Sequence, residues 1–199
     1  VGVHLTATCD WDRYRWGPIT GGRSLVTDDG CFPSTIAEVA DQADPDELEA
    51  EYIAQVELIM SRGLTPQHID HHMGWPMPEV IAKVARRHDL PARISSKNVP
   101  ADICFPFDSA TATSTVSGDR VAFLCDHLRQ LTPGWHLVNC HAAADGAELA
   151  SMCSAQYPAR AWAREYRVAD FETLIARQVR DLIEELGIKL STMGDHRGG

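Results

Sequence analysis

Residues 67–74 have the sequence QHIDHHMG, and residues 67–72 form a predicted β-strand that ends in a pair of histidines and lies between two predicted helices. The first helix has Asp44 as a favourable N-cap and Pro45 in its first turn, and it ends at Gly63. Its apolar positions recur at helical spacing: Leu48, Tyr52, Val56 and Ile59. The second helix begins at Pro78. Strands that alternate with helices predict an α/β fold with a parallel sheet.

The same alternation extends over the whole chain of 199 residues, which fits one domain spanning residues 1–199. Further strands are expected at residues 1–5, 91–95, 135–140 and 188–191, and further helices at residues 119–131 and 170–186. Residues 9–32 are rich in Gly and Pro and predict a long loop, which in compact domains is usually functional. About five strands are fewer than the eight of a complete barrel, so we expect N-terminal strands to be missing from this chain.

Charge and composition exclude several kinds of partner. The formal net charge of −10 argues against nucleic acid and against an anionic membrane, because both need a basic surface. A small neutral or polymeric substrate fits better. The six cysteines form no C-x-x-C pair, which predicts reduced, mostly buried thiols in a cytoplasmic protein. The oligomeric state stays open, and a homodimer is compatible with the sequence.

Histidines and an aspartate gather on the strand at residues 67–72. Because side chains alternate between the faces of a strand, His68, Asp70 and His72 share one face and His71 points the other way. Three side chains of this kind at a strand end suit a mononuclear metal site. The alternative interpretation is a polar surface strand.

Two other histidines end predicted strands. His4 follows the apolar Val1 and Val3, and His141 closes the apolar run at residues 135–140. In parallel α/β folds the active site lies beyond such strand ends, which favours a functional His141. Each of these histidines, taken alone, is equally compatible with a structural role. Trp16, in the long loop, is compatible either with stacking on a sugar or with a structural aromatic cluster.

Taken together, these segments resemble the YdjC-like carbohydrate deacetylases, which include chitooligosaccharide deacetylases. The resemblance spans nearly the whole chain. Residues 2–6 (GVHLT) resemble the family's G-[VIL]-H-[LF] strand, and residues 65–72 (TPQHIDHH) are similar to its P-T-H-[LI]-D-S-H motif, with His71 where Ser is usual. Residues 16–18 (WGP) and 73–74 (MG) match features of one subgroup, and residues 139–141 (NCH) resemble a late strand that ends in a functional His.

The resemblance implies a deformed (β/α) barrel related to polysaccharide deacetylases. It also implies one divalent metal ion, Mg or Zn, held by His4, His72 and an aspartate. In the family that aspartate lies in an Asp-Asp-x-Gly motif upstream of the G-x-H segment, and no such motif precedes Val1. His141 is then the catalytic acid, and His68 and Asp70 orient His72 or bind sugar hydroxyls.

Two functions remain open on this basis. The first is a metal-dependent hydrolase that removes acetyl groups from N-acetylated sugars or oligosaccharides. The second is a catalytically inactive paralogue or fragment that binds carbohydrate or metal, which the missing aspartate favours. A metallohydrolase that acts on another amide or ester is a third alternative.

Overall fold

The computed structural model describes residues 1–93, 100–105, 107–113, 118–152 and 164–198. The chain forms two compact units, one of Val1–Phe105 with Thr192–Gly199 and one of residues 106–191. Each unit has its own apolar core. The prediction of a single domain over residues 1–199 stays a prediction.

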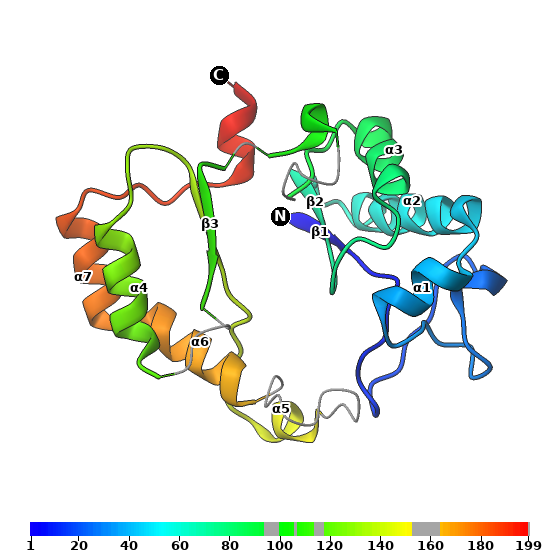
Figure 1. Cartoon of the computed structure of the whole chain (residues 1–199), viewed down its shortest axis with the longest axis horizontal. Helices are drawn as coiled ribbons and strands as arrows, with labels where there is room; N and C mark the ends of the chain where they lie inside the picture. Colours follow the sequence, from blue (N-terminus) through cyan, green and yellow to red (C-terminus); the bar gives the residue numbers. More distant parts are fainter. Residues whose placement is uncertain (94–99, 106, 114–117, 153–163, 199) are drawn as a thin grey trace. The chain divides into compact units, whose positions relative to one another are not determined.

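The first unit is built on parallel strands. β1 (Gly2–Leu5) pairs with β2 (His68–His71), and parallel bridges continue from Ile69 to Ala92 and from Ala92 to Cys104. The helices of this unit are α1 (Ile36–Gln42), α2 (Pro45–Ser61) and α3 (Pro78–His88), with short 3₁₀ turns η1 (Arg23–Leu25), η2 (Ala101–Ile103) and η4 (Met193–Gly198). Figure 1 shows α2 and α3 next to each other beside β1 and β2, and α2 contacts both β1 and α3.

Helix α2 covers one face of the β1–β2 pair. The apolar strand residues Val3, Leu5 and Ile69 are buried in the same core as Leu48 and Val56 of α2. Full burial of such a side chain contributes about 1.5–3 kcal/mol, so this face fixes the strand register. The predicted cap of α2 is confirmed, because the Asp44 side chain accepts hydrogen bonds from the first-turn backbone. The opposite face of the strands carries His4 and Asp70.

The second unit also contains a parallel strand pair. β3 (Ser109–Ala112) pairs with β4 (His136–Asn139). The helices are α4 (Arg120–Arg129), α5 (Ala147–Ser151), α6 (Glu165–Ile175) and α7 (Arg177–Glu185). Leu124 and Leu128 of α4 form the core together with Val179 and Leu182 of α7.

The C-terminal elements differ from the sequence predictions in two ways. The helix expected at residues 170–186 is two helices, because Ala176 adopts an extended conformation. The Thr173 hydroxyl donates to the Ala169 carbonyl in the turn before this break, a bond that typically bends helices. The strand expected at residues 188–191 is wrong. Gly187 and Ile188 instead donate to Glu184 and Ile183, which closes α7 with a Schellman motif.

The predicted α/β class with parallel pairing is confirmed. The strand pairings of the described residues form two small sheets, and the barrel stays a prediction. The strand expected at residues 91–95 is present only as bridges at Ala92, and residues 94–95 lie outside the described ranges. Three helices and strands of the described residues were not expected: α1, which a Thr35–Glu38 capping box begins, β3, whose residues are small, and α5.

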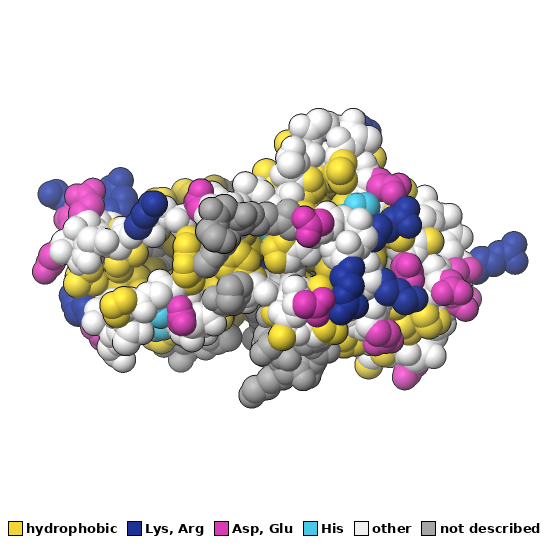
Figure 2. All heavy atoms as spheres, turned by 90° about the horizontal axis from the view of Figure 1, so that it is seen from above, with side chains coloured by type: hydrophobic (Ala, Val, Ile, Leu, Met, Phe, Trp, Pro, Cys, Tyr) yellow, Lys and Arg dark blue, Asp and Glu magenta, His cyan; other side chains and the backbone are white. Residues whose placement is uncertain are grey.

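The surface carries charges of both signs. Figure 2 shows basic and acidic side chains next to one another on the drawn face. The ion pairs of the protein include Lys83–Glu49 and Arg86–Asp102. Among the described residues, no helix is both long and apolar enough to cross a membrane. Cysteine burial is lower than expected: of the described thiols, Cys9 and Cys125 are buried, whereas Cys31, Cys104 and Cys140 are partly exposed.

Candidate active site

His4 and His72 lie next to each other in the first unit. The β1–β2 register places His4 opposite Asp70, and the His72 amide donates to the Leu5 carbonyl at 2.9 Å, which extends the pairing beyond the strand end. The two imidazole rings meet edge to face with their centroids 5.4 Å apart. The two imidazoles are therefore neighbours, and their joint role as metal ligands stays a prediction.

An ionised aspartate fixes the ring of His4. Nδ1 of His4 donates to Oδ1 of Asp70 at 2.7 Å, and Arg93 donates to Oδ2 from Nε and Nη2 at 2.9 and 2.6 Å. Burial raises the pKa of Asp70, but the hydrogen bonds and charges of His4 and Arg93 outweigh burial and bring that pKa to about 2. An ionised carboxylate can only accept, so His4 carries a proton on Nδ1, and in the neutral ring Nε2 is the nitrogen with the lone pair. The His4 side chain is 52% exposed.

His72 has a carboxylate partner of its own. Its Nε2 lies 2.9 Å from Oδ1 of Asp10, whose side chain is only 9% exposed. Sequence reasoning predicted that Asp70 could orient His72; the structure corrects this, since Asp70 pairs with His4 and Asp10 pairs with His72. Neither Asp10 nor Arg93 stood out in the sequence, because Asp10 begins an aperiodic loop and Arg93 follows an isolated bridge.

The other two histidines of the motif lie elsewhere. His71 is buried on the α2 side, as strand alternation predicted; its Nδ1 donates to the His72 carbonyl at 2.6 Å and its Nε2 accepts from the Tyr52 hydroxyl at 2.5 Å. Burial lowers the pKa of His71 to about 3, so this ring is neutral and structural. His68 lies against Gly2 at the opposite end of the strands, roughly 13 Å from His72 at about 3.3 Å per residue. The structure therefore does not bring His68 to the His4–His72 pair.

A pocket opens beside the paired histidines, with a volume of about 330 Å³. Trp16 forms part of its wall, with its ring centroid 6.5 Å from that of His72. The lining residues are His4, Thr6, Trp16, Gly17, Ile19, Phe32, Glu51, Gln55 and His72. This volume is at the low end of small-molecule sites, and an indole wall next to two imidazoles can bind a ligand with both an apolar face and polar groups.

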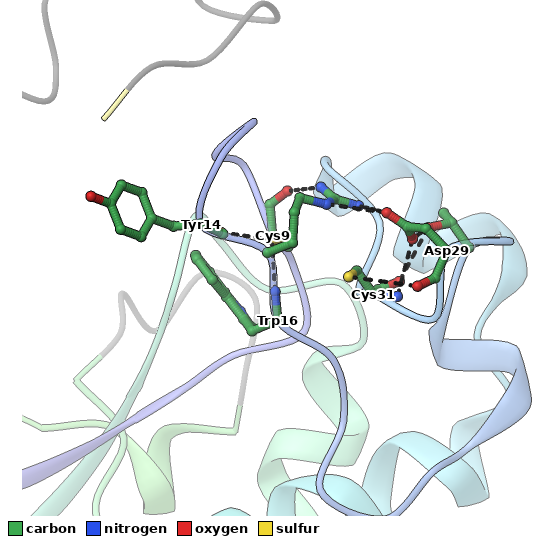
Figure 3. A network of polar contacts seen from close by, with 7 residues as sticks. Cys9, Tyr14, Trp16, Asp29 and Cys31 are labelled. Atoms are coloured by element: carbon green, nitrogen blue, oxygen red, sulfur yellow. Dashed lines mark hydrogen bonds and ion pairs between the residues drawn. The ribbon is translucent and has the colours of Figure 1, made fainter. Parts of the chain in front are cut away.

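Hydrogen bonds fix the loop that carries Trp16 (Figure 3). The Trp16 amide donates to the Cys9 thiol at 3.3 Å, and the Phe32 amide donates to the Trp16 carbonyl at 2.9 Å. Arg15 joins the Cys9 carbonyl to the Asp29 carboxylate at 3.0 Å on each side. The Thr27 hydroxyl and the Cys31 amide hold the pKa of Asp29 at about 2, so the pair keeps its charge. Burial raises the pKa of the Cys9 thiol, so Cys9 is a structural hydrogen-bonding group.

The backbone is strained directly after His72. Met73 has φ of 65° and Gly74 has φ of 139°, both in the left-handed region. A side chain at positive φ is uncommon, and such strain is concentrated at functional sites. The turn follows the end of β2 at His71 and leaves the His72 side chain at the edge of the pocket.

The residues present supply part of a metal site. Carboxylates behind metal-binding imidazoles are a common arrangement, because they fix the ring and its tautomer. His4 and His72 have this arrangement. Within the described ranges, however, no three His, Cys, Asp or Glu side chains are grouped so as to hold a metal ion. Among the residues that the structure describes, the donor set therefore consists of two imidazoles.

His141 belongs to the second unit and follows β4 after Cys140. Its backbone amide donates to Oδ2 of Asp170 at 2.8 Å. His141 thus lies at the carboxyl end of a parallel strand, as the sequence predicted. Asp170 had no signal in the sequence beyond its place in a predicted helix.

Comparison with known proteins identifies the family. The family model of YdjC-like proteins matches residues 1–185, and the chain therefore belongs to the YdjC-like family. A carbohydrate deacetylase of Enterococcus faecalis is 26% identical over 96% of this chain and 75% of its own length. One from Clostridium beijerinckii is 26% identical over 98% of this chain and 77% of its own length.

Other relatives align over shorter stretches. A carbohydrate deacetylase of Halalkalibacterium halodurans is 36% identical over 50% of this chain, and the aligned stretch spans only 43% of that relative's length. The crystal structure of an Enterococcus faecalis protein, described as a cellobiose-phosphate cleavage protein, matches with a TM-score of 0.73 at 25% identity, covering 98% of this chain and 77% of that chain.

Proposed function

We propose that this protein is a metal-dependent hydrolase that removes acetyl groups from N-acetylated sugars or oligosaccharides. The observation that carries the proposal is the pair of His4 and His72, each bonded to its own carboxylate, at the edge of a pocket with an indole wall. Relatives named carbohydrate deacetylases support the choice of sugar and of reaction.

His4 and His72 would hold one divalent ion, Mg or Zn, together with a third ligand that the described residues do not provide. Bound in this way, such an ion supplies Lewis-acid polarisation of the acetyl carbonyl and a lower pKa for bound water. Asp70 and Asp10 keep the two rings in place, and the Nδ1 proton on His4 leaves Nε2 as its ligand atom.

The reaction also needs a side chain that donates a proton. Hydrolysis joins a water oxygen to the acyl carbon and breaks the C–N bond, so the attacking water must give up a proton to a carboxylate base and the leaving sugar amine must gain one. We assign this proton to His141, because imidazole titrates near neutral pH and the family resemblance places a functional His at this strand end. Trp16 would stack on the apolar face of the sugar ring.

The second candidate function is a catalytically inactive paralogue that binds carbohydrate. The missing third ligand among the described residues favours it. The two functions differ in one observable: the binding protein takes up sugar and releases no acetate.

Acetate release from N,N′-diacetylchitobiose, with Mg²⁺ or Zn²⁺ added, tests the proposal. We expect metal-stimulated turnover that His72→Ala abolishes together with metal binding. His88→Ala, at the end of α3, is the matched control and should behave as wild type. Sugar binding without acetate release in the presence of either metal would establish the inactive paralogue instead.

A further inference from the structure

A buried carboxylate lies behind His141 in the second unit. Asp170 of α6 is 0% exposed, and both of its oxygens are used. Oδ2 accepts from the His141 amide at 2.8 Å, and Oδ1 accepts from the Thr113 hydroxyl and from Nη1 of Arg120, each at 2.7 Å. One side chain therefore joins the residue after β3, the first residue of α4 and the strand end that carries His141.

The cation of this cluster is itself buried and fixed. Arg120 is 8% exposed, also donates to the Tyr166 carbonyl at 2.9 Å, and lies 4.7 Å above the centre of the Tyr166 ring. A buried ion pair is weak evidence for stability, since apolar residues of similar volume often stabilise a core as well or better. What the carboxylate provides, and an apolar side chain could not, is an acceptor for the His141 amide.

We propose that Asp170 is a positioning residue for His141, an inference that rests on the proposed acid role of His141. Asp170 contacts the main chain of His141, so it fixes the Cα–Cβ direction from which the imidazole projects. A displacement of about 1 Å in a catalytic group can cost roughly 10²-fold in rate. Asp170 therefore acts on turnover through the placement of His141 and makes no contribution to sugar binding.

Asp170→Asn tests this role with little change of volume. Its NH2 group must face either the His141 amide or the two donors on the other side, so one set of bonds is lost whichever way the amide turns. We expect kcat for acetate release to fall by roughly 10²-fold with KM near wild type, and the His141 amide to exchange its hydrogen faster. Asp181→Asn, in the exposed Arg177–Asp181 pair of α7, is the matched control and should change neither.

The double variant separates positioning from general damage. If Asp170 acts through His141, then His141→Ala with Asp170→Asn should be no slower than His141→Ala alone. A further fall in the double variant, or an unchanged kcat in Asp170→Asn, would overturn the proposal. If Asp170→Asn does not fold, Thr113→Val replaces it; this variant removes one bond to Oδ1, and we expect kcat to fall by about 2- to 10-fold. An unchanged kcat there would also overturn it.

The result for His141→Ala separates the proposed acid role of His141 from the positioning role of Asp170. Full activity in His141→Ala would remove the acid role and the positioning role together. Low activity in His141→Ala with full activity in Asp170→Asn would remove only the positioning role.

Discussion

Glu51 provides the sharpest test of how the pocket wall is held. This carboxylate is 0% exposed, and each of its oxygens accepts two hydrogen bonds. Oε1 accepts from the Ile19 amide at 3.1 Å and from Gln55 at 2.8 Å, and Oε2 accepts from the Thr20 amide at 2.9 Å and its hydroxyl at 2.8 Å. In Glu51→Gln the new NH2 group faces two donors whichever way it turns.

The expected cost follows from this geometry. A hydrogen bond to a charged group contributes about 1.5–3 kcal/mol, so the loss of two such bonds amounts to roughly 3–6 kcal/mol before solvent is considered. Ile19 is 53% exposed, and Thr20 is exposed as well, so water can replace part of the loss. We therefore expect Glu51→Gln to lower the free energy of unfolding by about 1.5–3 kcal/mol.

Glu47, one turn earlier on α2, is the matched control. Among the described residues, its hydrogen bonds are both accepted by Oε2, from the Ser24 amide at 2.8 Å and the Ser24 hydroxyl at 2.7 Å. The single carbonyl oxygen of a glutamine can serve both donors, so Glu47→Gln should cost no more than about 1 kcal/mol, mainly from the lost charge at the helix N-terminus.

Urea unfolding of both variants measures the difference, and KM for acetate release should rise in Glu51→Gln alone, because Ile19 lines the pocket. Equal losses of unfolding free energy in Glu51→Gln and Glu47→Gln would refute the argument that the cost depends on whether both carboxylate oxygens or one accept hydrogen bonds. A Glu51→Gln variant as stable as wild type would refute it as well.

Three further predictions concern His141, Trp16 and Tyr52. His141→Ala should lower acetate release by roughly 10²–10⁴-fold while metal content, measured by elemental analysis, stays at the wild-type level. Trp16→Ala should raise KM roughly 10-fold with kcat little changed, and a fall in kcat alone would argue against a stacking role. Tyr52→Phe should lower the free energy of unfolding by about 1–3 kcal/mol, because it removes the hydroxyl that donates to the buried Nε2 of His71. Urea titrations measure this change. Tyr14→Phe, at an exposed tyrosine, is the control and should change the free energy of unfolding little.

The elements predicted correctly were those with strong local signals. Asp44 and Pro45 at the start of α2 and Gly187 after α7 each determine a helix end through one or two residues. β3 had no such signal: its residues are Ser109, Ala110, Thr111 and Ala112, and they form a strand because β4 lies beside them. The apolar residue Ile188 suggested a strand, but it packs against the core of the second unit, as the hydrophobic residue after a Schellman motif often does.

Strand alternation predicted the site in part. It correctly separated His71 from Asp70, because the two faces of a strand depend only on the backbone. It could not tell which end of the strand matters, so it grouped His68 with His72 although they lie at opposite ends. The partners Asp10 and Asp170 depend on loop and helix placement, which no local pattern in the sequence encodes.

The contact of Asp70 with His4 and that of Asp170 with His141 differ in a way that matches the roles proposed for the two histidines. Asp70 bonds Nδ1 of the His4 ring, which fixes the tautomer of the neutral ring and leaves Nε2 as the nitrogen that can bind a metal ion. Asp170 bonds the main chain of His141, so it fixes the position from which the ring projects. A group that must release and regain a proton in each cycle benefits from being held by its backbone, because its carboxylate contact survives both protonation states. On this argument metal content depends on the first contact and proton transfer on the second.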